Sequence, residues 1–148
     1  MRIGAAILAL ALCTFIGYMK ADKVKERMRT IDSFLRDIRQ ISMQIEFTSD
    51  PISIIIDKIS KDSELAELWQ EFLRHLNDGM SCSMAWTAAS KSREDLIAVL
   101  ANEERIGLDE FFSTLGRLDK ASEKKNAEHI YKLLEDISSR LKKTHRTV

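Results

Sequence analysis

The chain begins with an uninterrupted apolar run and then changes to apolar residues at helical spacing. Residues 3–19, "IGAAILALALCTFIGYM", carry no charge. As a helix, this run would be about 26 Å long at ~1.5 Å per residue, slightly shorter than a ~30 Å hydrocarbon core. The Lys20 side chain can extend to the interface and make up the difference. The pattern predicts a transmembrane anchor over residues 1–21.

A cleaved signal peptide is the main alternative to an anchor. Cleavage needs small residues just before the cut, and Tyr18, Met19 and Lys20 do not provide them. A lipoprotein signal would use "LALC", but Leu12 is bulky for the position before Cys13, and the apolar run continues past it. We therefore favour an anchor that stays attached.

The charges that flank the apolar run predict its orientation. Before the run stand only Arg2 and the amino terminus. The basic residues that follow the run are Lys20, Lys23, Lys25, Arg27 and Arg29, against Asp22 and Glu26. Positive charge marks the side that stays in the cytoplasm, so we expect a cytoplasmic body over residues 22–148. We interpret these basic side chains as a solvated flank, with a lipid-headgroup site as the alternative.

The helix is expected to continue from the membrane into the soluble domain without a break, as far as about Phe47. Its apolar residues recur at steps of three and four, which is the spacing of one helical face. They are Val24, Met28, Ile31, Phe34, Leu35, Ile38, Ile41 and Ile45.

The remaining sequence predicts several shorter helices that pack into a bundle. Asp50 is a candidate N-cap with Pro51 at the first helical position, and "NDG" at residues 77–79 is a typical helix stop. Ser92 and Asn102 are further candidate caps. The apolar faces comprise Ile52, Ile55, Ile56 and Ile59; Leu65, Leu68, Trp69, Phe72, Leu73 and Leu76; Met84, Ala85, Trp86 and Ala88; Leu96, Ile97, Val99 and Leu100; Ile106, Leu108, Phe111, Phe112 and Leu115; and Ala127, Ile130, Leu133, Leu134, Ile137 and Leu141.

The stretch "STLGRLD", residues 113–119, predicts a sharp corner between the last two helices. Gly116 follows the last apolar residue of one helix, where a left-handed residue closes the helix without a Cβ clash. Asp119 stands where the next helix, expected to reach about Lys143, needs an N-cap.

Composition agrees with a helical chain and excludes several classes of function. One proline and five glycines in 148 residues are too few for an all-β protein rich in turns. The 23 basic and 23 acidic residues cancel, so no global field attracts nucleic acid. Cys13 and Cys82 give neither a disulfide framework nor a metal-ligand spacing.

The sequence contains no constellation typical of a catalytic, metal or cofactor site. His75, His129 and His145 lack ligand spacing, and there is no glycine-rich phosphate loop and no nucleophile beside a base. Glu103 and Glu104 are explained by the dipole at a helix N-terminus. We therefore expect no enzyme activity, no cofactor and no small-molecule substrate. A small helical lyase or mutase is the alternative.

The segment "ANEERIGLDEFFSTLGRLDKASEKKNAEHI", residues 101–130, resembles the hallmark segment of the stage III sporulation protein AB family. In that family, a helix that ends in Leu-Gly after a phenylalanine leads into an Asp-capped helix with a His-Ile pair. The matching residues are Phe112, Leu115, Gly116, Asp119, His129 and Ile130. The membrane segment, the long basic helix, the helix at "DPIS" and Trp86 also agree in order.

The sequence departs from the family pattern in two respects. Leu118 stands where a small polar residue is usual, and a glutamine expected near Lys125 or Asn126 is absent. The family also has a second apolar membrane segment at its end, whereas the sequence here ends in "LKKTHRTV". Either this member has one span, which is how we interpret residues 1–148, or the chain is truncated before the second.

The resemblance implies a helical bundle similar to the cytoplasmic, F-type platform domains of type II secretion systems. It implies a non-enzymatic, structural role in the membrane channel complex that joins mother cell and forespore during endospore formation. The implied partners are other stage III channel proteins and a secretion-type ATPase, with the body of the protein on the mother cell side. The six matching residues are the candidate partner contact, together with Asp109, Glu110 and the run 120–125. The alternative to a partner contact is that the corner only shapes the bundle. The alternative to the sporulation role is an adaptor of a general secretion or pilus system.

Overall fold

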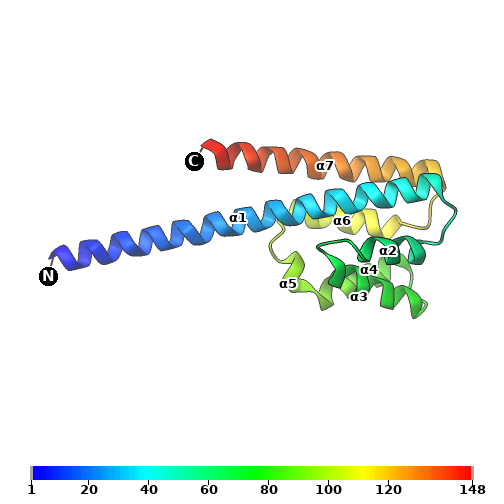
Figure 1. The fold of residues 1–148 in the computed structure, drawn as a ribbon, viewed down its shortest axis with the longest axis horizontal. Helices are drawn as coiled ribbons and strands as arrows, with labels where there is room; N and C mark the ends of the chain where they lie inside the picture. Colours follow the sequence, from blue (N-terminus) through cyan, green and yellow to red (C-terminus); the bar gives the residue numbers. More distant parts are fainter. Residues whose placement is uncertain (1, 148) are drawn as a thin grey trace.

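Seven helices and no strand make up residues 2–147, the part of the chain that the computed structural model describes (Figure 1). The helices are α1 (Arg2–Phe47), α2 (Ile52–Ser60), α3 (Ala66–Asn77), α4 (Cys82–Ser92), α5 (Glu94–Ile97), α6 (Asn102–Thr114) and α7 (Lys120–Thr147). The shorter helices lie on one side of α1, and α7 lies along α1 in the opposite direction. The predicted all-α class is confirmed.

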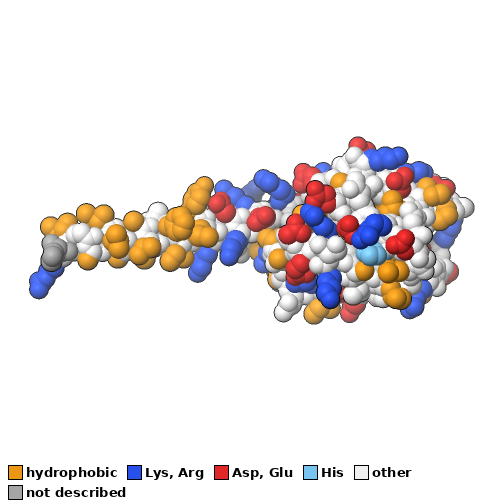
Figure 2. Space-filling model, turned by 90° about the horizontal axis from the view of Figure 1, so that it is seen from below, with side chains coloured by type: hydrophobic (Ala, Val, Ile, Leu, Met, Phe, Trp, Pro, Cys, Tyr) orange, Lys and Arg blue, Asp and Glu red, His pale blue; other side chains and the backbone are white. Residues whose placement is uncertain are grey.

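The first part of α1 projects from the bundle as an isolated apolar rod. An 18-residue window of this helix has a mean hydropathy of 1.8, and none of that window is buried. In the described part of the chain, α1 is the one helix long and apolar enough to cross a membrane. Figure 2 shows hydrophobic side chains around the rod and basic side chains where it meets the bundle.

The second part of α1 pairs with α7 over most of the length of α7. The Lys124 ammonium lies 2.9 Å from the Glu46 carboxylate near one end of the pair, and Ser138 donates a 2.9 Å hydrogen bond to Asp32 near the other. Each step forward along α7 therefore matches one step back along α1. This antiparallel register brings the end of α7 back toward the part of α1 that leaves the bundle (Figure 1).

The core lies between this helix pair and the shorter helices. Its centre is a cluster of aromatic rings from α1, α3, α4 and α6, comprising Phe34, Trp69, Phe72, Trp86 and Phe112. The rings of Trp86 and Phe112 are stacked with centroids 4.0 Å apart. Trp86 also donates a 2.8 Å hydrogen bond from its indole nitrogen to Asp109. This cluster fixes the position of α6, and thereby of the corner that follows it.

Several local predictions are wrong in detail. The N-cap of α2 is Pro51 rather than Asp50, whose carboxylate instead pairs with Lys58 at 2.9 Å. Ser92 is the last residue of α4 and caps no helix, and α6 has Ala101 rather than Asn102 at its N-cap position. Each of these errors arises because a side chain that can cap is engaged elsewhere or stands one position too late.

Two residues predicted to face the core are exposed. Ile106 is 58% exposed, and Met84 is also exposed. On α6, the buried positions are Glu104, Gly107, Leu108, Phe111 and Phe112. The absence of a side chain at Gly107 lets α7 approach closely, because a Cβ there would lie 2.8 Å from the Ile130 and Leu133 side chains.

Candidate functional site

The corner between α6 and α7 has the backbone geometry that the sequence predicted. Gly116 adopts a φ of +83°, the left-handed region that glycine occupies without a Cβ penalty. A Cβ at this position would meet Cys82 Sγ at 3.6 Å and Ile52 Cγ1 at 3.7 Å, which are ordinary contacts. The requirement for glycine therefore comes from the backbone angle rather than from lack of space.

Two acidic side chains accept hydrogen bonds that stabilise the corner. Asp119 precedes the first residue of α7 and accepts hydrogen bonds from Ser122, which lower the pKa of its carboxyl group below its ordinary value. The Glu123 carboxylate, which is buried, accepts a 2.6 Å hydrogen bond from the backbone N–H of Gly116. The role of Asp119 was predicted. That of Glu123 was not, although an acidic residue in the first turn of a helix is the signal that could have indicated it.

The structure divides the six motif residues into a buried group and an exposed group. Phe112, Leu115 and Ile130 belong to the core. Gly116, Asp119 and His129 are exposed. Only the second group is accessible to a partner, and the first group fixes the packing of α6 against α7.

Two exposed apolar side chains flank the corner at the end of the bundle farthest from the apolar rod. Phe47, the last residue of α1, is 77% exposed, and Leu118 is 41% exposed. Lys120 donates a 3.5 Å hydrogen bond to the carbonyl oxygen of Thr48, which joins the end of α1 to the start of α7. We call the surface formed by Phe47, Gly116, Leu118 and Asp119 the distal tip.

His129 lies away from the distal tip, in a separate groove between α6 and α7. The groove has a volume of about 280 Å³. Its wall includes Gly107, Glu110, Thr114 and Asn126, and the Asn126 amide donates a 3.4 Å hydrogen bond to Thr114. At ~1.5 Å per residue, His129 is about 15 Å along α7 from Asp119. The motif therefore does not form one continuous patch.

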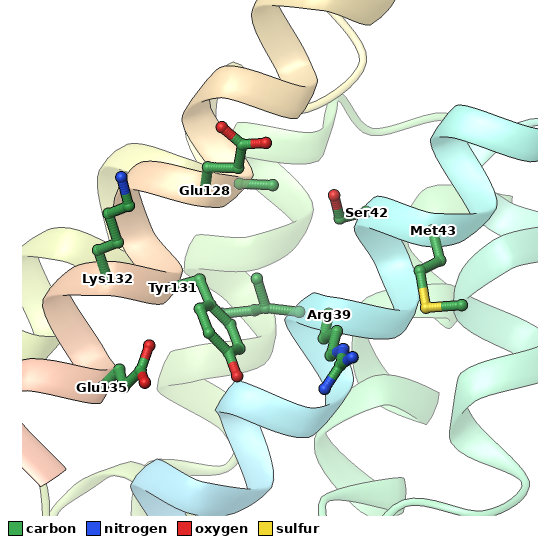
Figure 3. Close-up of a pocket in the computed structure, with 9 residues that line it drawn as sticks. Arg39, Ser42, Met43, Glu128, Tyr131, Lys132 and Glu135 are labelled. Carbon is green, nitrogen blue, oxygen red and sulfur yellow. The ribbon is translucent and has the colours of Figure 1, made fainter. Parts of the chain in front are cut away.

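A larger groove, of about 440 Å³, runs between α1 and α7 on the face that the shorter helices leave open (Figure 3). Ile38 and Ala127 are its buried apolar members. Arg39 and Tyr131 stand on opposite walls. Sequence reasoning missed this groove, because it depends on how α7 is placed along α1.

A buried ion pair joins α1 to the first turn of α6. Two guanidinium nitrogens of Arg27 lie 2.5 and 2.6 Å from Oε1 of Glu104. The Glu104 side chain is 0% exposed, and its Oε2 has no hydrogen-bond partner. The helix dipole, proposed from the sequence, is thus only part of the environment of Glu104, and Arg27 provides the specific partner.

The described residues contain no group of three or more side chains arranged to hold a metal ion. Burial raises the pKa of the Cys82 thiol, and nearby Glu123 raises it further. A thiol with a raised pKa is a poor nucleophile at neutral pH.

Comparisons with known proteins agree on one family. A family model described as stage III sporulation protein AB matches residues 2–147. A solved structure titled "Stage III sporulation protein AB (SpoIIIAB)" aligns with a TM-score of 0.72 and 22% sequence identity, covering 82% of this chain and 97% of that chain. At that identity, the likeness shows that the fold is shared. A search of curated proteins gives no match.

Proposed function

Because the chain belongs to the stage III sporulation protein AB family, we propose that it is a structural platform in the membrane channel complex between mother cell and forespore. The family is one of structural sporulation proteins and is not a known enzyme family. The match over residues 2–147 favours this complex over a general secretion or pilus system.

The observation that carries the proposal is the position of the distal tip relative to the apolar rod. In this proposal, residues 1–21 span the membrane once and residues 22–148 form a bundle in the mother cell cytoplasm. At ~1.5 Å per residue, Phe47 stands about 40 Å along α1 from Lys20. The helix α1 is continuous from Arg2 to Phe47, so it holds the tip at a distance from the membrane where a cytoplasmic partner can reach it.

We place the partner contact at the distal tip. The partner in this proposal is a secretion-type ATPase that lies below the channel, as expected if the bundle acts like the platform domains of type II secretion systems. Phe47 and Leu118 supply apolar area that would be buried, and Gly116 and Asp119 fix the loop that presents Leu118. Phe112, Leu115 and Ile130 act through the packing of the corner, and His129 belongs to the side groove.

The experiment that tests this function is purification of the tagged full chain from membranes of sporulating cells, with partners identified by mass spectrometry. Other stage III channel proteins and a secretion-type ATPase should be recovered together with the chain. The double variant Phe47→Ser and Leu118→Ser should lose the ATPase, whereas the matched variant Ile106→Ser, which also changes an exposed apolar residue, should keep it. Recovery of the chain alone, or only with metabolic enzymes, would refute the proposal.

A further inference from the structure

The larger groove is lined by α1 and α7 alone, and its charges are divided between its two walls. Arg39 is the charged residue of the α1 wall, whereas Glu128, Lys132 and Glu135 are those of the α7 wall. All four side chains are exposed. The α1 wall is therefore positive, and the α7 wall has two acidic residues against one basic residue.

These four side chains form no ion pair within the described part of the chain. Other exposed charges of the same two helices do pair, as Lys124 does with Glu46 at 2.9 Å. In Figure 3, Arg39 and the acidic residues of the α7 wall stand on opposite sides of the groove. The unpaired charges of each wall are thus available to a second molecule with the opposite charge.

The antiparallel register fixes which residues of the two helices lie at the same level. Glu46 is level with Lys124. Arg39, seven residues earlier on α1, is therefore level with Tyr131, seven residues later on α7. The Tyr131 side chain is half-buried and lines the groove at this level.

A second copy of the chain matches these charges if a two-fold axis runs along the groove. Such an axis places α1 of each copy over α7 of the other, and it keeps every residue at its own level. Arg39 of one copy then stands at the level of Tyr131 of the other, between Glu128 and Glu135. At ~1.5 Å per residue, these two acidic residues are about 4.5 and 6 Å away along the helix, a separation that the long side chains can span.

The apolar residues of the groove match in the same arrangement. Met43 is 50% exposed, and by the same register it is level with Ala127, which is buried at the base of the groove. The flexible Met43 side chain of one copy therefore meets a small residue of the other, as a knob meets a hole. The Tyr131 ring offers its face to the Arg39 guanidinium of the second copy. The four helices would form a bundle with an apolar centre and charged edges.

The apolar rod favours this direction of the axis. Because α1 is one continuous helix, an axis along the groove leaves the two rods parallel, so that residues 1–21 of both copies can enter one membrane from the same side. An axis across the helices would point the two rods in opposite directions.

From the charges, the register and the rods, we infer that the chain forms a two-fold symmetric dimer through the groove between α1 and α7. The dimer presents two distal tips at the same distance from the membrane. The choice of axis rests on the proposed insertion of residues 1–21, whereas the contact itself requires no other protein.

Sedimentation of the purified full chain in detergent, at increasing protein concentration, tests for the dimer. The wild-type chain should show monomer and dimer in equilibrium. Arg39→Glu, or Glu128→Arg together with Glu135→Arg, sets like charges against each other across the contact. Each of these variants should weaken dimerisation by at least about tenfold, because two symmetric sets of contacts change from attraction to repulsion. The control Lys91→Glu reverses an exposed charge on α4 and should leave the dimer unchanged.

A mixture of the two variants gives the sharpest result. In the mixed pair, the new carboxylate at position 39 of one copy faces the two new guanidinium groups of the other, and the wild-type charges at the second contact attract as before. The mixture should therefore form heterodimers about as readily as the wild-type chain forms dimers, which also shows that both variants fold.

A wild-type chain that stays monomeric, a dimer that withstands both charge reversals, or a mixture that stays monomeric would overturn the inference. The measurement uses the purified chain and no sporulation protein. Failure of the dimer and failure of the proposed platform function are therefore separate results.

Discussion

The guanidinium group of Arg27 is held against the buried carboxylate of Glu104, at 2.5 Å. Arg27 lies seven residues beyond Lys20, and Glu104 belongs to the first turn of α6. The pair therefore joins the part of α1 just beyond the apolar run to α6, the helix that leads into the Gly116 corner. Its energetic importance follows from the burial of Glu104, because a carboxylate without water needs a partner.

Replacing Arg27 with Met should destabilise the bundle, because the Glu104 carboxylate would remain buried without its cation. Removing one member of a buried pair costs about 3–5 kcal/mol, and we expect the lower end because 25% of the Arg27 side chain is exposed. The double variant Arg27→Met and Glu104→Met should recover most of the loss. Chemical unfolding of the detergent-solubilised chain measures both changes, and a double variant no more stable than Arg27→Met would contradict this account.

Replacing Gly116 with Val should lower the free energy of unfolding by about 1–3 kcal/mol, because a β-branched residue is strained at positive φ. Asn tolerates the left-handed region, so Gly116→Asn should cost less than Gly116→Val. Space is available for a Cβ, which separates backbone strain from crowding. Thermal unfolding of the purified chain compares the variants. An unchanged melting temperature for Gly116→Val would argue against the observed backbone geometry.

The Asp37 carboxylate should make the bundle less stable as pH rises. A carboxylate in an exposed ion pair has the opposite effect, because its pKa is lowered in the folded state. Burial raises the pKa of Asp37 above the ordinary 3.8, and hydrogen bonds from Ser63 and Trp69 lower it only in part. The folded state therefore holds the proton more tightly than the unfolded state. Stability contributed by this group is present at low pH and decreases as pH rises from about 3.8 through the raised pKa.

The variant Asp37→Asn isolates this contribution, because it keeps an oxygen acceptor for Trp69, whose indole donates to Asp37 at 2.8 Å. Its stability relative to wild type should increase with pH above 3.8 and become constant above the raised pKa of Asp37. Denaturant unfolding of both proteins across this range gives the comparison. A stability of Asp37→Asn relative to wild type that falls as pH rises would have the opposite sign and contradict the assignment.

The sequence predicted the features that depend on neighbouring residues. The stop at Gly79, the turn at Gly116 and the cap at Asp119 are local, because each requires a particular backbone angle or a side chain near the first turn of a helix. The predicted family is confirmed by the family model that matches residues 2–147.

Features that depend on how the helices are placed were missed. Arg27 and Glu104 are 77 positions apart, and nothing in either local sequence indicates the other. Adjacent His129 and Ile130 appeared as one motif, but the helical turn sends one to the surface and the other to the core. Phe47 was expected only as the end of a rod. Its exposure beside the corner follows from the register between α1 and α7.

The central claim is that the distal tip contacts a cytoplasmic partner in the sporulation complex. A photo-cross-linking amino acid at position 118, expressed in sporulating cells, tests that contact directly, with position 106 as an exposed control on α6. Position 118 should give a cross-linked product that contains a secretion-type ATPase, and position 106 should not. Cross-linking of the ATPase at position 106 but not at 118, or at neither position in cells that contain the assembled complex, would contradict the claim.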